Sequence, residues 1–212
     1  MKQYDLQVHT DASPCSRATP TEIVEGAIDA DLDGIAITNH DTLNGYDEVA
    51  DRAPSSLTVI PGVEVTTTQG HLLALFVEQE PPQADPLTVI EHVHGQNGLA
   101  ILSHPFDRLR EYYETDLEAI ASQVDGIEAQ NSRCLFPRFN RRAREFADRH
   151  NLAITGGSDA HFPMEVGRST TVCDQPLREA IQSRSTQTAG RGGYLSGHTA
   201  TKLNDLLRMV NL

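Results

Sequence analysis

The chain has almost no lysine and no long hydrophobic segment. Only two of its 17 basic residues are lysines, whereas 30 residues are acidic and the net charge is −13. A surface of this kind is typical of a high-salt cytosol, because carboxylates retain water and salt screens their mutual repulsion. We therefore favour a halophilic archaeon as the source, and an ordinary acidic bacterial protein is the alternative. No run of 18 apolar residues occurs, so we expect no transmembrane helix.

Signals for export are missing as well. The N-terminus leads directly into a predicted strand, without the apolar region of a signal peptide. The three cysteines, Cys15, Cys134 and Cys173, are odd in number and irregularly spaced. This argues against a disulfide framework and indicates a reducing cytoplasm. The acidic charge also argues against long nucleic acid as a partner, because no basic stripe is present to displace counterions. The sequence gives no indication of an oligomeric state.

Short apolar stretches alternate with amphipathic ones along the 212 residues, which is the pattern of an α/β fold with one hydrophobic core. Thr19, Pro20 and Glu22 predict a capped helix start, and Gly98 is the expected C-cap of a helix over 85–97. Further helices are expected at 44–53, 116–123, 137–150, 176–184 and 199–210. Strands are expected at 4–9, 34–38, 57–67, 70–77, 99–104, 126–131, 168–173 and 186–190, and the segment 152–161 is expected to end in the last motif.

Metal-type ligands stand at or just past the ends of several of these strands. They occur in DLQVH (5–9), TNHDT (38–42), PGVEVT (61–66), GHLLAL (70–75), SHP (103–105) and SDAH (158–161). Imidazoles and carboxylates that different strands deliver to one face of a sheet or barrel are the usual components of a multi-metal hydrolase. By contrast, His92, His94 and His150 fall on predicted helices, where we expect them to be solvated, and His198 precedes the last helix.

These motifs, in this order, resemble those of the polymerase-and-histidinol-phosphatase (PHP) superfamily of metal-dependent phosphoesterases. The resemblance covers about residues 4–174 and implies a distorted (β/α)7 barrel, with a closing segment at about 175–212. It also implies metal-ligand roles for His9, His40, Glu64, His71, His104, Asp159 and His161. Glu64 would bridge two cations, which would offset the cost of placing a carboxylate among apolar neighbours.

The first motif departs from the family pattern. The family opens with Asp-Leu-His-x-His, but here Gln7 precedes His9 by two residues, on the same side of the strand. An amide oxygen is a poor ligand for transition metals, so this cation site is either weakened and rich in oxygen or vacant. Cys15 stands where relatives have a histidine. We leave open whether its thiolate is a ligand or a buried thiol.

Other residues near the motifs are candidates for catalysis and substrate binding. Asp41 follows His40 and is expected to orient an imidazole or to transfer a proton. We expect Asp41, His161 and Arg17 to serve catalysis. Cationic and polar side chains past strand ends are candidates for contacting the phosphate or lining the pocket, namely Arg17, Arg133, Glu128 and Asn131.

Two functions compete. The first is hydrolysis of small phosphate esters, nucleotides, nucleoside bisphosphates or short oligoribonucleotides by hydroxide that two or three Mn, Fe or Zn ions activate. The second is a PHP-fold module that has lost catalysis and serves binding or regulation. Gln7 favours the module, whereas the six ligand-type residues His40, Glu64, His71, His104, Asp159 and His161 favour the enzyme.

Overall fold

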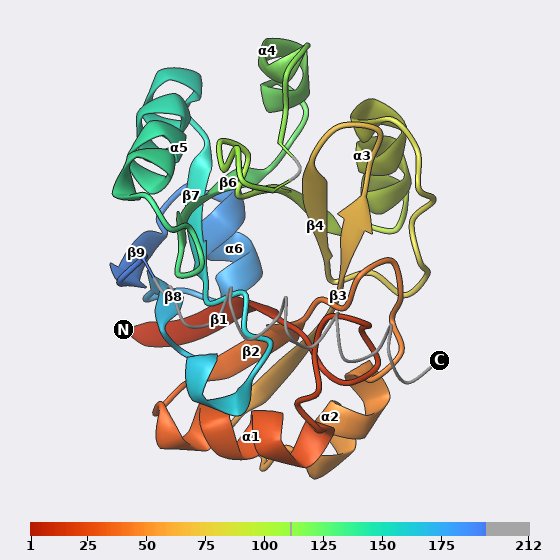
Figure 1. Ribbon diagram of the computed structural model, residues 1–212, viewed down its shortest axis with the longest axis vertical. Helices are drawn as coiled ribbons and strands as arrows, with labels where there is room; N and C mark the ends of the chain where they lie inside the picture. The colour runs from red at the N-terminus through yellow and green to blue at the C-terminus, as the bar shows by residue number, and fades with distance from the viewer. Residues whose placement is uncertain (111, 194–212) are drawn as a thin grey trace.

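The computed structural model describes residues 1–110 and 112–193, and its sheet contains nine strands in the order β7-β6-β5-β4-β3-β2-β1-β8-β9 (Figure 1). The strands are β1 (Lys2–Val8), β2 (Gly34–Ile37), β3 (Thr58–Thr66), β4 (His71–Leu75), β5 (Leu99–Ser103), β6 (Gly126–Asn131), β7 (Ala153–Gly157), β8 (Ser169–Cys173) and β9 (Gln187–Gly190). The helices are α1 (Pro20–Asp29), α2 (Tyr46–Arg52), α3 (Pro86–Gly95), α4 (Leu117–Ala121), α5 (Pro137–His150) and α6 (Leu177–Gln182), with a 3₁₀ turn η1 at Pro163–Glu165.

Strands β1 to β7 curl into a nearly closed barrel. Neighbouring strands run parallel from β1 to β3 and from β5 to β7, whereas β4 is antiparallel to both β3 and β5. The seam is closed just past β7, where Ala160 accepts from the amide of His9 at 2.9 Å and donates to the carbonyl of Gln7 at 3.2 Å. Strands β8 and β9 extend the sheet from β1 in antiparallel fashion. The predicted distorted seven-stranded barrel is confirmed.

Apolar side chains fill three clusters that hold the strand ends in place. One packs α1 against β1 and β2 through Ile23, Val24, Val8, Ile35 and Ile37. A second lies under α3 and α5, and a third joins α6 to the barrel strands. Helices α1 and α2 lie beneath β1 to β3 in Figure 1, and α5 and α3 lie at the upper left and the upper right of the view. No helix in the described ranges is long and apolar enough to cross a bilayer.

The predicted start of helix α1 is confirmed, and the predicted C-cap of helix α3 is wrong. Thr19 and Glu22 form the predicted capping box. Helix α3 ends at Gly95, and the left-handed residue is Asn97 at φ 59°, so the prediction of Gly98 as the C-cap is wrong. Gly98 is needed for another reason, because a Cβ there would lie 2.8 Å from Val77 and 2.9 Å from Val93. The predicted helix over 199–210 and His198 lie outside the described residues.

Candidate metal centre

The carboxylate of Glu64, in β3, lies at the centre of a group of imidazoles. Its Oε1 atom is 3.2 Å from both His71 Nδ1 and His104 Nε2, and its Oε2 atom is 3.2 Å from His9 Nε2 and 3.6 Å from His40 Nε2. Glu64 is buried. Burial alone would raise its pKa, but His40 and His71 hold the pKa of the carboxyl well below its ordinary value. Each oxygen therefore faces its own pair of rings, which is the geometry of a bridging ligand.

Five imidazoles form a continuous row around this carboxylate. The ring centroids of His161 and His9 are 4.6 Å apart, those of His9 and His40 5.0 Å, those of His40 and His71 5.2 Å, and those of His71 and His104 5.5 Å. Each ring comes from a different strand end. His9 directly follows β1, and His104 directly follows β5. His40 lies after β2, His161 lies after β7, and His71 is the first residue of β4. The barrel thus brings together rings that five different strands supply.

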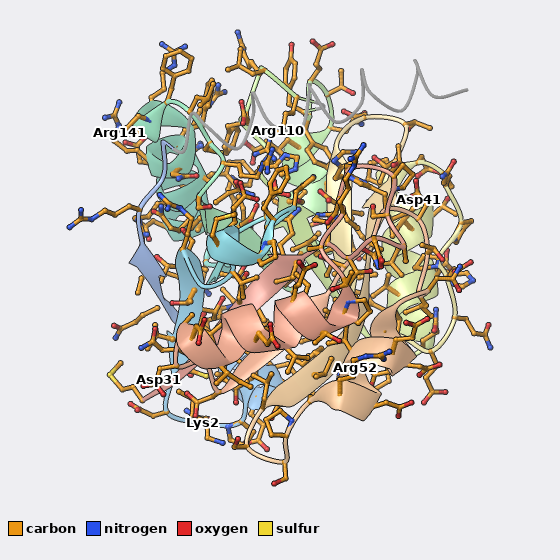
Figure 2. All side chains as sticks on the ribbon, turned by 60° about the horizontal axis from the view of Figure 1, so that its bottom comes forward. Lys2, Asp31, Asp41, Arg52, Arg110 and Arg141 are labelled. Carbon is orange, nitrogen blue, oxygen red and sulfur yellow. The ribbon has the colours of Figure 1, made fainter. Side chains whose placement is uncertain are left out.

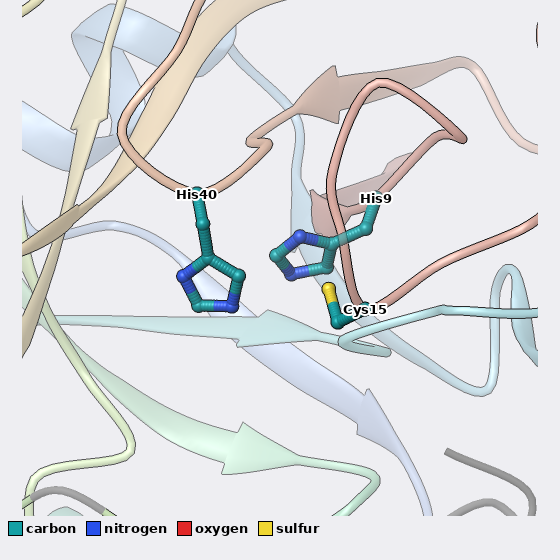
Figure 3. Close-up of side chains that lie close together, drawn as sticks. All are labelled: His9, Cys15 and His40. Atoms are coloured by element: carbon teal, nitrogen blue, oxygen red, sulfur yellow. The ribbon is translucent and has the colours of Figure 1, made fainter. Parts of the chain in front are cut away.

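Cys15 joins the row at its His9 end. The sulphur atom points toward the His9 ring, with His40 on the other side (Figure 3). The ligand atoms of His9, Cys15 and His40 lie within 4.8 Å of one another. Burial raises the pKa of the Cys15 thiol, but His9, His161 and His40 outweigh it and lower the pKa to about 3. The thiol therefore lies in surroundings that favour thiolate, the form that binds metals.

Asp159 lies beside the same end of the row, and its two oxygens have different neighbours. Oδ1 is 3.3 Å from His9 Nε2 and 3.5 Å from His161 Nδ1, whereas Oδ2 accepts from the guanidinium of Arg110. Burial would raise the pKa of Asp159, but Arg110 and His9 hold it well below its ordinary value. Asp159 and His104 have left-handed backbones, with φ of 56° and 28°. Such strain in non-glycine residues is often found at functional sites.

Two buried ring nitrogens in this cluster have no hydrogen-bond partner within the described residues. They are Nδ1 of His9 and Nδ1 of His104. A buried polar atom without a partner is costly, and a cation would remove that cost. Burial and Arg110 lower the pKa of His104, so its lone pair is available. Three groups of ligand atoms could hold an ion: His9–Cys15–His40, His9–Asp159–His161 and His40–Glu64–His71. The donor set, rich in imidazole with thiolate and carboxylate, suits Zn, Fe or Mn.

Gln7 lies next to this cluster inside a network of neutral amides. Its Nε2 donates to Ser103 Oγ at 3.3 Å, and its Oε1 accepts from Asn131 Nδ2 at 3.2 Å. The same Asn131 nitrogen lies 3.0 Å from Glu128 Oε2 and 3.4 Å from Asp159 Oδ2. Burial, followed by the charge of Asp159, raises the pKa of Glu128 well above its ordinary value. The predicted site residues Gln7, Glu128 and Asn131 are thus brought together on the Asp159 side.

Arg110 is the residue that sequence reasoning missed. It lies on the loop after β5, bound to Asp159 and Asp107, and its Nη2 is 3.3 Å from Asn131 Oδ1. Burial opposes its charge, but the facing carboxylates raise its pKa. The sequence offered one signal, which is that Arg110 follows Asp107 by three residues. The segment around them has no helical or strand-like periodicity of apolar residues. Arg110 therefore supplies a fixed positive charge where Gln7 leaves the ligand set incomplete.

The side chains of two predicted catalytic residues, Asp41 and Arg17, make no hydrogen bond with the imidazole row among the described residues. The carboxylate of Asp41 accepts from the backbone amide of Thr66 at 2.7 Å and from its hydroxyl at 2.9 Å, and this holds the turn after His40. The backbone amide of Asp41 donates to the carbonyl of Glu64 at 3.0 Å. Arg17 is exposed on the loop before α1. His92 and His94 are exposed on α3, as expected, and His150 is half-buried at the end of α5.

Arg133 was predicted to contact substrate, but it is buried against Glu165. Its Nη1 atom lies 3.1 Å from Glu165 Oε2, and the same oxygen accepts from the amide of His161 at 2.7 Å. Arg133 is 3 % exposed. The observed contact of Arg133 therefore supports the loop that carries Asp159 and His161. Glu165, in η1, was not predicted from the sequence either.

Comparisons with known proteins agree with this fold and site. The PHP-associated family model matches residues 137–186. The chain is 31 % identical over 173 residues to the uncharacterized protein MJ0417 of Methanocaldococcus jannaschii, which covers 79 % of this chain and 68 % of that protein. The 5'-3' exoribonuclease Rnm of Salmonella typhimurium is 27 % identical over 175 residues, and the chain spans 51 % of its length.

A solved structure shows the same architecture at lower identity. A two-domain protein from Bacteroides vulgatus, which contains a predicted PHP-like metal-dependent phosphoesterase, superposes with a TM-score of 0.77 at 22 % identity. The match covers 90 % of this chain and 65 % of that one. The motif order, the barrel, the shared carboxylate of Glu64 and these relatives agree, and the chain belongs to the PHP superfamily.

Proposed function

We propose that this chain is a metal-dependent hydrolase of phosphate esters that works with two or three divalent cations. The observation that supports it best is the position of Glu64, whose two carboxylate oxygens each lie 3.2 to 3.6 Å from two imidazoles. Two cations would share this carboxylate, one with His71 and His104 and one with His9, His40 and Cys15. A third would rest on Asp159 and His161, where Gln7 weakens the ligand set.

Cations at such a site lower the pKa of bound water to near neutrality and neutralise charge on a phosphoryl group. The residues of the chain prepare the site for this. Glu64 and Asp159 stay ionised, and Asp159 Oδ2 fixes the Arg110 guanidinium next to them. His161 is oriented through Nδ1, 2.8 Å from the carbonyl of Asp159. Of the three expected catalytic residues we keep His161 in the proposed machinery, because the side chains of Asp41 and Arg17 make no hydrogen bond with the row among the described residues.

The substrate class that we propose is a small phosphorylated molecule, with nucleotides and short oligoribonucleotides preferred. The relationship to 5'-3' exoribonucleases supports this choice, although the chain spans only about half of their length. The excess of acidic residues supports action in a high-salt cytosol and argues against long duplexes.

Metal analysis combined with kinetics tests the proposal. Protein purified without chelator should contain about two or more transition-metal equivalents per chain and hydrolyse p-nitrophenyl phosphate or a nucleotide with added Mn. Asp159→Ala and His104→Ala should each lower kcat/KM by about a hundredfold or more, while the circular dichroism spectrum stays that of the folded protein. His94→Ala is the matched control, since His94 lies on α3 and pairs with Asp125, just before β6. Wild-type kinetics in both ligand variants would end the assignment.

A further inference from the structure

A groove on the outer side of α5 gathers arginines in a chain that is otherwise strongly acidic. It has a volume of about 390 Å³. Its lining residues are Arg108, Arg138, Phe139, Arg141, Arg142 and Glu145. Four arginines against one glutamate give the groove a net charge of +3, although the whole chain carries −13. Such a local reversal of sign attracts anions over a distance of about one Debye length.

Most of these arginines rest on aromatic rings instead of pairing with carboxylates. Arg138 lies 4.5 Å over the Phe136 ring, Arg142 4.5 Å over Phe106, and Arg108 5.6 Å over Tyr112. Among the described residues only Arg141 of the groove has a carboxylate partner, Glu145 at 3.8 Å. A guanidinium stacked on a ring keeps the N–H groups at its edge available for an anion.

Other hollows on the molecule have a different character. One beside α1 is lined by Glu22, Glu25 and Asp29, and one beside α2 by Asp47, Glu48 and Glu78. These two hollows are lined by six acidic residues and would repel phosphate, whereas the α5 groove would attract it.

The groove is connected to the metal centre through short polar contacts. Asn140, flanked by groove residues on α5, exchanges two hydrogen bonds with the backbone of Asn131, at 3.2 and 2.9 Å. Asn131 contacts Arg110, which binds Asp159. Arg108 and Arg110 stand two residues apart on the loop after β5, so this loop borders both the groove and the centre. Figure 2 shows Arg110 and Arg141 along the same edge of the molecule.

We propose that the α5 groove binds a short single-stranded oligonucleotide. One phosphate of the oligonucleotide is hydrolysed at the metal centre, and the groove binds the phosphates that follow it along the strand. Arg138, Arg141 and Arg142 contact successive backbone phosphates along the groove. The inference rests on the proposed phosphoesterase function and adds a second binding subsite to it.

The test measures binding and hydrolysis separately. The probe for binding is a 5'-phosphorylated tetraribonucleotide with phosphorothioate linkages, which resist hydrolysis, and a 3' fluorophore, followed by fluorescence anisotropy with the metal-loaded protein. The groove variant is Arg138→Gln/Arg141→Gln, and the control is Arg52→Gln/Arg149→Gln, which removes the same charge from positions that do not line the groove. The groove variant should bind the probe about tenfold more weakly at low salt and have a salt dependence shallower by about 1.4 in log–log slope. The control should stay within about twofold of the wild type.

Hydrolysis gives the second measurement. With added Mn, the groove variant should have a raised KM for the tetranucleotide and unchanged kcat/KM for p-nitrophenyl phosphate, which has a single phosphate. The proposal that the groove binds the oligonucleotide would be overturned by either of two results. The groove variant and the wild type would bind the probe with equal affinity, or the control variant would lose as much affinity as the groove variant. Absence of hydrolysis of every ester by the wild-type protein would overturn the phosphoesterase proposal instead, and the anisotropy measurement would still decide whether the groove binds the probe.

Discussion

Asn131 donates a hydrogen bond from Nδ2 to Gln7 Oε1 across 3.2 Å, and the same nitrogen faces Glu128 and Asp159. The amide oxygen of Gln7 is therefore already engaged by a neutral donor. A side chain held in this way contributes little to a cation on the Asp159 side, where Arg110 already supplies positive charge. The first motif has Gln7 where the family pattern has a histidine, and in the structure the Gln7 side chain is hydrogen-bonded to Asn131.

Gln7→His should add an imidazole two residues before His9 and release Asn131 from position 7. We expect tighter binding of one cation and a shift toward Zn or Fe, because imidazole is a softer donor than an amide oxygen. Titration of metal into stripped protein measures this, with circular dichroism to check folding. If stoichiometry and affinity match those of the wild type, the side chain at position 7 does not reach a cation.

Cys15→Ser should weaken the site formed with His9 and His40. A hydroxyl is a much poorer ligand for Zn than a thiolate, so affinity for Zn should fall by about tenfold to a hundredfold, whereas affinity for Mn should change less. Competition with a chromogenic chelator reports both values. Cys173→Ser is the control, because this thiol lies on β8 and donates to the carbonyl of Gln175. Equal Zn affinity in both variants would show that Cys15 is a buried thiol only.

Glu165→Gln should destabilise the fold by about 3 to 5 kcal/mol, because it removes the negative charge that faces the buried guanidinium of Arg133. Arg133→Met should cost a similar amount, because it removes the guanidinium that faces the buried carboxylate of Glu165. The double variant should cost clearly less than the sum of the two. Urea unfolding of all four proteins gives the coupling energy. Strictly additive costs would mean that the two side chains do not depend on each other.

Stability should rise with salt, because 30 acidic and 17 basic residues leave the compact state with repulsion that ions screen. The melting temperature measured in low salt and in multimolar KCl checks this. KCl and tetramethylammonium chloride should act alike if screening is responsible. A melting temperature that does not change with salt would remove the inference of a high-salt habitat.

The ends of several strands could be predicted from the sequence because a metal-ligand type of residue stands at or just past the end of each of these apolar runs. His9, His40, Glu64 and His104 are recognisable in this way, and so is the barrel that brings them together. Arg110 could not be recognised, since its position depends on a loop without period that folds back over Asp159. The hydrogen bond from the amide of Thr66 to the Asp41 carboxylate could not be predicted either, because it joins two separate segments of the chain.

The same limit explains the error at Gly98 and the unforeseen partner of Arg133. A glycine after a helix usually indicates a left-handed cap, but here Asn97 adopts that conformation and Gly98 is required by close packing against Val77. Arg133 follows a strand end, where a substrate contact was reasonable. Its partner, Glu165, lies 32 residues further along the chain, on a turn that no local pattern relates to it.

The seam of the barrel has a consequence for how the protein opens. The short stretch around Ala160 joins β1 to the segment after β7, and Ala160 lies between Asp159 and His161 and bonds to Gln7 and His9. A cation bound by His9 and Asp159 would therefore tie β1 to that segment. Amide hydrogen exchange at His9 and Ala160 should then be slow in the metal-loaded protein and accelerate first after chelation, because closure of the fold and occupation of the centre depend on the same few residues.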